Sequence, residues 1–220
     1  MGVGFFASFF QMLHSVIERQ GGEDKLWWIS SKRGIFKVKA LFHSLDSVVE
    51  RRFPWKSVWR TQAPSRAAFF VWSAGLDKIL TLDNLKKRQV IVTNRCCMCK
   101  RSEETVDHLL LHCEIASTLW DAMFSCFGLA WVMPRRVVDL LARWWSSGRL
   151  RSAAVWKMLP TCLFWCLWQE RNNRCFEDLE RSFEDILSLC FHTLYLWTVA
   201  HLSPVSISYD DFLACFSLSS

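Results

Sequence analysis

Apolar residues recur at helical intervals through most of the chain. The spacing of three and four residues between apolar positions is that of a helix with one buried face. Helices are predicted over "PSRAAFFVWSAGL", "TLDNLKKR", "VDHLLLHCEIASTLWDAMF", "RRVVDLLARWW", 153–176 and 182–202. Pro64 favours the start of the first of these, and Thr81 is a suitable N-cap for the second. The pattern therefore predicts a mostly α protein.

One short stretch departs from the helical period. Trp27 to Ser30 and Ile35 to Val38 suit β-strands, and the Ser-Ser-Lys-Arg-Gly between them supplies a turn. The predicted fold class is mostly α with a small N-terminal β-hairpin.

Tryptophans are expected in the core. The tryptophans that recur at helical spacing are Trp55, Trp59, Trp72 and Trp120. The first predicted helix should bury the face that carries Ala68, Phe69, Trp72 and Leu76.

The segment from Ile186 to Tyr209 has no formal charge, which raises the question of a membrane span. Histidines, serines and Pro204 interrupt it, and its fully apolar runs are short. Apolar positions at helical spacing are Leu187, Cys190, Phe191, Leu194 and Trp197. We expect a core helix and no membrane partner.

Composition excludes wholesale disorder, because 51% of residues are hydrophobic and 22% are charged. The start of the chain lacks a basic n-region and an A-x-A-like cleavage site, and Phe6 departs from the myristoylation pattern. An intracellular, reducing compartment is therefore expected, where clustered cysteines indicate metal or buried thiols. Six cysteines outside the densest cluster should be unpaired: Cys126, Cys162, Cys166, Cys175, Cys190 and Cys215.

The densest cluster is "CCMCKRSEETVDHLLLHC", residues 96 to 113. Cys96-x2-Cys99 is half of a typical zinc site, since two thiolates at this spacing can bind one tetrahedral ion. The other half is either His108 with Cys113 or His108 with His112. Cys113 could take part only if the helix ended or distorted near residue 111, because residues five apart diverge by about 140° on an α-helix. Cys97 could replace Cys96, but C-x-C is a poorer chelating pair.

Positive charge is concentrated next to this cluster. Between Arg51 and Arg101 only Asp77 and Asp83 are acidic. Lysines and arginines at this density can neutralise phosphates, which indicates nucleic-acid binding. The candidates are Arg60, Arg66, Lys86, Lys87, Arg88, Arg95, Lys100 and Arg101. The alternative for 86–88 is a solvated helix end.

These motifs, in this order, resemble a known family. "WWISSKRGIFKVKALF", "FPWKSVWRTQAPSRAAFFVWSAGLDKILTLDNLKKR", "CCMC" and "EETVDHLLLHCEIASTLW" resemble the zinc-binding domain attached to reverse transcriptases of plant non-LTR (LINE-type) retrotransposons. The resemblance implies Zn²⁺ held by Cys96, Cys99, His108 and Cys113. Lys37 and Ala40 depart from the serines usual in the lead. "VWKMLPTCLFWCLWQERNNRCFED" is similar to the segment that follows this domain in plant elements.

The resemblance also implies an organisation along the chain: a zinc-stabilised helical domain followed by a C-terminal helical segment. The expected parts are an N-terminal lead (1–24), the zinc-binding domain (25–125), a connecting helix and linker (126–152), the C-terminal helical segment (153–202) and a tail (203–220).

No catalytic carboxylates of a polymerase or ribonuclease H are found, so we expect no enzyme. "SYDDF" at 208–212 is interpreted as a solvated turn, and "QERNNR" at 169–174 as surface charge capping a buried helix. The function implied is a non-catalytic module that binds nucleic acid, RNA more than DNA, or the rest of a retroelement polyprotein. The alternative is a purely structural or protein-interaction zinc domain, including a decayed retroelement fragment.

Overall fold

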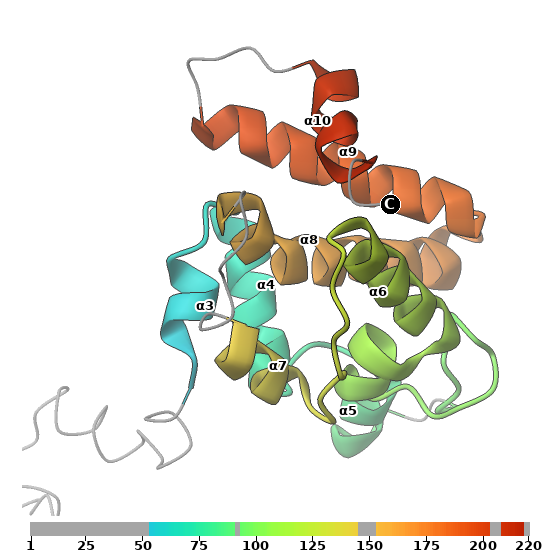
Figure 1. Cartoon of the computed structure of the whole chain (residues 1–220). Helices are drawn as coiled ribbons and strands as arrows, with labels where there is room; N and C mark the ends of the chain where they lie inside the picture. The colour runs from blue at the N-terminus through green and yellow to red at the C-terminus, as the bar shows by residue number, and fades with distance from the viewer. Residues whose placement is uncertain (1–52, 91–92, 145–152, 203–207, 218–220) are drawn as a thin grey trace, which may run out of the picture. The chain divides into compact units, whose positions relative to one another are not determined.

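The computed structural model describes residues 53–90, 93–144, 153–202 and 208–217, all within the unit formed by residues 52–220 (Figure 1). The hairpin expected within residues 27–38 lies outside them. Within the described ranges every regular element is a helix. These are α3 (Trp55–Trp59), α4 (Ser65–Gly75), α5 (Leu82–Lys87), the π-helix η2 (His108–His112), α6 (Glu114–Cys126), α7 (Val137–Trp144), α8 (Ala153–Asn172), the π-helix η3 (Asn173–Glu177), α9 (Phe183–Leu202) and α10 (Tyr209–Ser217). The mostly helical prediction is confirmed for this part of the chain.

Helix α8 is the central element of the core. It packs against α9 on one side and against α4 and η2 on others, as Figure 1 shows for α9. Because neighbours cover most of its surface, α8 is apolar on nearly every side. Its buried residues include Trp156, Leu159, Leu163, Phe164 and Leu167.

An aromatic cluster fills the space beside α8. The rings of Trp144 and Trp156 stack with centroids 4.0 Å apart, and Trp120 meets Trp144 edge-on at 5.7 Å. The indole N–H of Trp144 donates to the Trp156 carbonyl at 2.8 Å, and that of Trp120 donates to the Leu110 carbonyl at 3.0 Å. A buried indole N–H usually has such a partner. The expectation of a core position is confirmed for Trp120.

Two of the tryptophans expected in the core are exposed instead. Trp55 is 44% and Trp59 is 46% exposed. Helix α3 turns Ser57 and Val58 inward, and the Ser57 hydroxyl donates to the carbonyl of Leu141 in α7 at 2.5 Å. Residues on the opposite side of this short helix therefore face outward.

The buried face of α4 is also displaced from the predicted one. Phe70 and Val71 are buried, whereas Phe69 is 56% exposed. Phe70 stacks on Trp168 of α8 with centroids 5.4 Å apart. The helix therefore lies rotated by about one residue, because contact with α8 decides which aromatic of the Phe69–Phe70 pair is buried.

Helix α10 corrects the interpretation of "SYDDF" as a solvated turn. The Ser208 hydroxyl accepts the N–H of Asp211 at 3.1 Å and donates to its carboxylate at 2.7 Å, which caps a helix beginning at Tyr209. Phe212 is buried, and Tyr209 meets Tyr195 of α9 edge-on at 5.3 Å.

Helix α9 has the one-sided burial expected of a core helix. Ile186, Cys190 and Leu194 are fully buried, whereas Leu196 is half exposed. Among the described residues no helix combines the length and apolarity that a membrane crossing requires.

Candidate metal centre

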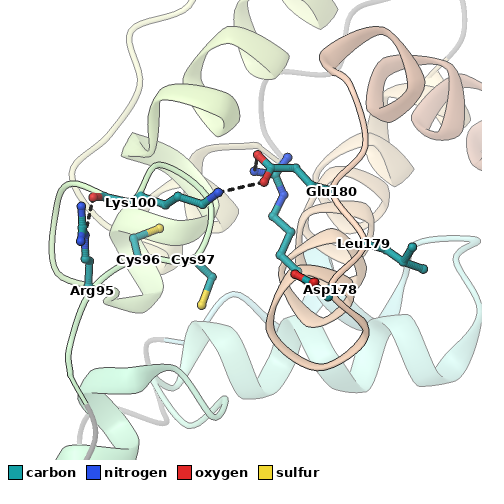
Figure 2. A pocket seen from close by; sticks show the side chains of 8 residues that line it. Arg95, Cys96, Cys97, Lys100, Asp178, Leu179 and Glu180 are labelled. Carbon is teal, nitrogen blue, oxygen red and sulfur yellow. Dashed lines mark hydrogen bonds and ion pairs between the residues drawn. The ribbon is translucent and has the colours of Figure 1, made fainter.

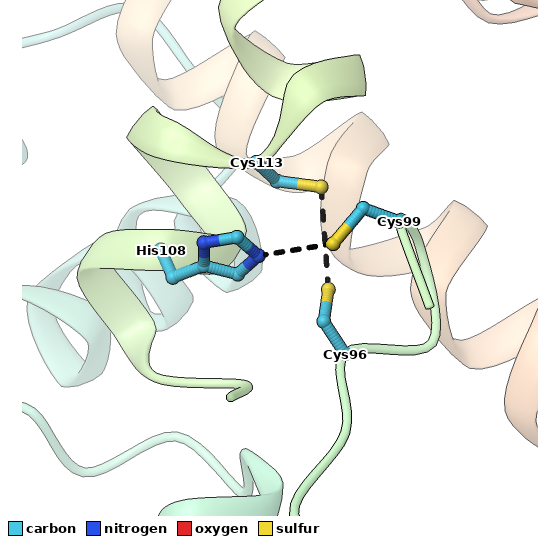
Figure 3. Close-up of side chains that lie close together, drawn as sticks. All are labelled: Cys96, Cys99, His108 and Cys113. Carbon is cyan, nitrogen blue, oxygen red and sulfur yellow. Dashed lines mark hydrogen bonds between the residues drawn. The ribbon is translucent and has the colours of Figure 1, made fainter. Parts of the chain in front are cut away.

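A tight loop presents the first two candidate ligands. In this metal loop (residues 95–102), the Cys96 N–H donates to the Ser102 carbonyl at 2.8 Å and the Cys96 carbonyl accepts the Lys100 N–H at 2.9 Å. Lys100 has φ of 57°, a left-handed conformation that costs a non-glycine residue about 1–2 kcal/mol. The turn places the Cys96 and Cys99 thiols on one side of the loop (Figure 3).

A π-helical turn presents the other two. The Cys113 N–H donates to the His108 carbonyl at 2.6 Å, an i→i+5 bond that brings residues five apart close together. Leu109, Leu110 and Leu111 are fully buried and anchor the turn. The helix predicted across 106–124 is therefore interrupted: Cys113 is extended, with φ −58° and ψ 142°, and α6 begins after it. The distortion that a ligating Cys113 requires is present.

Four donor atoms converge between the loop and η2 (Figure 3). The Sγ atoms of Cys96, Cys99 and Cys113 and a ring nitrogen of His108 all lie within 4.8 Å of one another. The Sγ atoms of Cys96 and Cys113 are 4.0 Å apart, and Cys99 Sγ is 3.4 Å from His108 Nε2. Within the part of the chain that the structure describes, this is the group of cysteine, histidine or carboxylate side chains placed to hold a metal ion.

The alternative ligands point elsewhere. His112 is exposed, and its Nε2 lies 3.0 Å from the carbonyl oxygen of Arg135. Cys97 forms a disulfide with Cys175 of η3. The structure thus brings together the first candidate set and not the set containing His112. The prediction that Cys175 is unpaired is wrong, because η3 returns against the metal loop, whereas Cys126, Cys162, Cys166 and Cys190 are free as predicted.

The four groups perturb one another's protonation. The hydrogen bond with Cys113, together with burial, raises the pKa of the Cys96 thiol to about 12, and the same bond lowers the pKa of Cys113. Contact with Cys96 raises the pKa of His108. Burial opposes ionisation of Cys99, but the backbone N–H groups of Ser102 and Arg101 outweigh it and lower its pKa. An ion bound here would replace these shared protons with its own charge.

A buried glutamate binds the backbone of the metal loop. The Glu104 side chain is fully buried, and one of its oxygens accepts the N–H of Cys97 at 3.3 Å. The other accepts the N–H of Leu82, at the start of α5, at 3.1 Å. Thr81 occupies the N-cap position of α5 as predicted, but the Leu82 N–H is bonded to Glu104 and not to the Thr81 side chain. The same oxygen lies 2.7 Å from Nη2 of Arg171 in α8, whose side chain is 3% exposed.

The segment after α8 also contacts the metal loop. Arg174 donates to the Met98 carbonyl at 3.2 Å, and Lys100 pairs with Glu180 at 2.9 Å. Figure 2 shows this junction, where a cavity of about 300 Å³ separates the loop from residues 178–180. The metal loop is therefore held in place by contacts with residues after α8.

"QERNNR" at 169–174 is not surface charge. The Glu170 carboxylate is buried and pairs with Arg174 at 2.8 Å and with Arg181 at 3.0 Å. Sequence reasoning missed Glu104, Glu170 and Arg171, and the i,i+4 spacing of Glu170 and Arg174 was the available signal.

The basic candidates divide into three groups along the chain. Arg60 follows α3, and the Arg66 guanidinium lies 5.5 Å from the centre of the Trp165 ring. Lys86, Lys87 and Arg88 end α5, where Lys87 pairs with Asp83 at 3.1 Å and Asp77 at 3.4 Å. Arg95, Lys100 and Arg101 flank the ligands, and Arg101 pairs with Glu114 at 2.9 Å.

The fold and the four-donor cluster define a metal-binding helical domain. Residues 36–120 match the family described as zinc-binding in reverse transcriptase. Over these residues the chain is similar to a zinc-binding domain of reverse transcriptases, and this part of the resemblance predicted from the sequence is confirmed.

A relative points in the same direction. Over 104 residues the chain is 27% identical to an Arabidopsis thaliana protein named "Putative ribonuclease H protein". The alignment covers 46% of this chain and 17% of that protein, so the chain spans a small part of its relative. No solved structure matches the chain.

Proposed function

We propose that this chain is a non-catalytic zinc-binding module, derived from a plant LINE-type retrotransposon polyprotein, that binds nucleic acid through a basic surface, RNA in preference to DNA. The observation that carries the metal-binding part is the convergence of Cys96, Cys99, His108 and Cys113.

Donor chemistry and spacing favour zinc as the ion. In a tetrahedral zinc site two thiolate sulfurs lie about 3.8 Å apart, and a sulfur and an imidazole nitrogen about 3.5 Å apart, from the usual bond lengths. The corresponding distances here are 4.0 and 3.4 Å. Three thiolates and one imidazole suit zinc and disfavour magnesium or calcium.

A structural role for the ion follows from the number of ligands. Catalytic zinc keeps one position open for water or substrate, whereas four protein donors fill all positions of a tetrahedral ion. The site residues in this proposal hold the metal loop against η2, and none is assigned to a reaction. The ion would supply folding free energy and no chemistry.

Nucleic-acid binding is supported by charge and by relatedness. The segment from Arg51 to Arg101 is strongly basic, and the relatives are described by reverse transcriptase and ribonuclease H, names that concern nucleic acids. Pairing of Lys87, Lys100 and Arg101 with carboxylates reduces the charge that can contact phosphates. Arg60, Lys86 and Arg88 have no ion-pair partner among the described residues.

The test is a titration of the zinc-loaded chain with a labelled 20-nucleotide single-stranded RNA, followed by fluorescence anisotropy at several salt concentrations. Binding that weakens linearly in log K against log salt supports the proposal. The same-length DNA and duplex RNA rank the ligands. No binding at low salt, where electrostatic attraction is strongest, would leave the structural or protein-interaction role.

A further inference from the structure

Helix α3 carries two exposed tryptophans next to two exposed basic residues. Trp55 and Trp59 are i,i+4 neighbours on one face, and Lys56 and Arg60 form a second i,i+4 pair beside them. Both indoles are nearly half exposed, which is unusual for the largest apolar side chain. The two tryptophans together with Lys56 and Arg60 are called the α3 face below.

The fold fixes this face toward solvent. Val58 is fully buried, and the Ser57 hydroxyl is bonded to the carbonyl of Leu141, so the opposite side of α3 is held against the core. Phe53 is 5% exposed and supports Trp55 edge-on, with ring centroids 5.0 Å apart. Rotating α3 to bury the indoles would expose Val58 and break the bond to α7. The exposure of the tryptophans is thus a consequence of packing.

The chain segment that carries the α3 face has charge of one sign. From residue 53 to residue 76 the sequence contains Lys56, Arg60 and Arg66 and no acidic residue. Neither Lys56 nor Arg60 has an ion-pair partner among the described residues. An occupant of this face must therefore offer flat apolar surfaces to the indoles and negative charge to the flanking cations.

We propose that the α3 face is a stacking platform for unpaired bases of a single-stranded nucleic acid, with Lys56 and Arg60 contacting its phosphates. The proposal rests on the proposed function. It combines Arg60, already a basic candidate, with Trp55, Trp59 and Lys56, which were not candidates for binding. Aromatic side chains stack with bases of any sequence, and neighbouring cations track the backbone. Residues four apart on an α-helix are separated by about 6 Å along its axis, which leaves room for Trp55 and Trp59 to meet separate bases.

A second copy of this chain is a less suitable occupant. In a twofold contact through α3, Lys56 and Arg60 of one copy would face the same cations of the other, and like charges oppose such an interface. Self-association is therefore an outcome of the test that would contradict the platform.

The experiment compares two 20-nucleotide strands: single-stranded RNA with all bases present and an abasic strand with the same number of phosphates. Trp55→Ala and Trp59→Ala should each weaken binding of the base-bearing strand about five-fold or more, and leave the salt slope and the binding of the abasic strand unchanged. Lys56→Gln with Arg60→Gln should weaken binding of both strands and lower the slope by about 1.4.

Controls separate the platform from general effects. Phe176→Ala removes an aromatic side chain that is 73% exposed on η3, and it should change neither binding curve. Trp55→Phe with Trp59→Phe keeps two stacking rings and should retain part of the base-dependent affinity, which guards against a folding defect in the alanine variants.

Each remaining outcome is decisive. If the wild-type chain binds neither strand, the proposed function fails. If it binds RNA but the Trp55→Ala and Trp59→Ala variants bind equally well, the platform is wrong and the proposed function stands. Equal losses in Phe176→Ala, or concentration-dependent dimerisation abolished by the tryptophan substitutions, would also overturn the platform.

Discussion

At the scale of single residues, the metal cluster is specified by one backbone irregularity. His108 and Cys113 are five residues apart, and on an α-helix their side chains would diverge. The i→i+5 bond from Cys113 N–H to the His108 carbonyl removes that divergence, and the exposed His112 is left bonded at the Arg135 carbonyl. The choice of fourth donor is therefore made by the backbone.

Ligand substitutions test this choice. Cys99→Ser, His108→Ala or Cys113→Ala should each lose bound zinc and local structure, because structural zinc contributes about 10–16 kcal/mol of apparent binding free energy. His112→Ala should keep one zinc per chain. Metal content of the purified variants, measured by mass spectrometry, is the readout. Zinc retained in Cys113→Ala and lost in His112→Ala would reverse the assignment.

Glu104 should contribute to stability through its buried ion pair with Arg171. Glu104→Gln leaves the Arg171 guanidinium buried without its counter-charge, and breaking a buried pair in this way costs about 3–5 kcal/mol. Urea unfolding measures the change in the free energy of unfolding.

The matched control for Glu104 is Glu114→Gln. It breaks an exposed pair with Arg101 and should cost less than about 1 kcal/mol. Equal costs in the two variants would mean that Glu104 contributes no more than a surface charge.

At the scale of elements, the spacing of apolar residues predicted where helices form better than it predicted which face of each helix is buried. The stretches 153–176 and 182–202 are the helices α8 with η3 and α9, because long apolar periods leave few alternatives. The predicted buried face of α4 was wrong by about one residue, because the adjacent apolar residues Phe69 and Phe70 fit either of two rotations of the helix. The prediction that α3 buries its tryptophans was also wrong. Contact with α8 and α7 decides between the rotations, and no local pattern contains that contact.

The ligand set was open from spacing alone for a related reason. Sequence shows which donors are near one another but not where a helix becomes π-helical, so His112 and Cys113 were equally available. The family resemblance selected Cys113, and the structure brings it to the cluster. The buried pair Glu104–Arg171 spans 67 residues and has no local signal at all.

The C-terminal end of α5 supplies a prediction at this scale. Lys87 pairs with Asp77 and Asp83, and the hydrogen bond to Asp83 raises its pKa. Because the two carboxylates already offset its charge, Lys87 should add less to phosphate binding than its neighbours. Lys86→Gln with Arg88→Gln should lower the salt slope by about 1.4, and adding Lys87→Gln should lower it little further. Anisotropy titrations of both variants measure the slopes. An unchanged slope would make this run a solvated helix end.

At the scale of the whole molecule, the family match ends at residue 120 but the packing does not. Cys175 and Glu180 contact the metal loop directly, and Arg171 pairs with Glu104, which accepts the N–H of Cys97 in the loop. Helix α8 also contributes a large share of the buried core. The zinc-binding domain and the C-terminal helical segment, expected as separate parts, pack against each other in the described residues. We expect each to depend on the other for stability.

Truncation tests this interdependence. A chain ending at residue 152 lacks α8 and should bind zinc weakly and unfold without a cooperative transition, since Glu104 and the apolar face of α4 lose their partners. A chain ending at residue 202 lacks residues 203–220, which include α10, and should behave like the full chain. Circular dichroism during heating, with zinc content, distinguishes them. A cooperative, zinc-loaded fragment 1–152 would show that the metal domain is self-sufficient.

The separation of Glu104 and Arg171 in the sequence also affects the order in which the chain folds during its synthesis. A ribosome adding about 5–20 residues per second makes Arg171 roughly 3–13 s after Glu104, because the two are 67 positions apart. Two of the metal donors precede Glu104 in the chain and the other two follow it within nine residues, so all four are synthesised well before Arg171. The nascent chain can therefore chelate its ion while Glu104 still has water as its partner. Closure of the loop onto α8 then becomes a late step of biogenesis, and a ribosome that stalls before Arg171 would hold a metal-loaded chain with an unburied core.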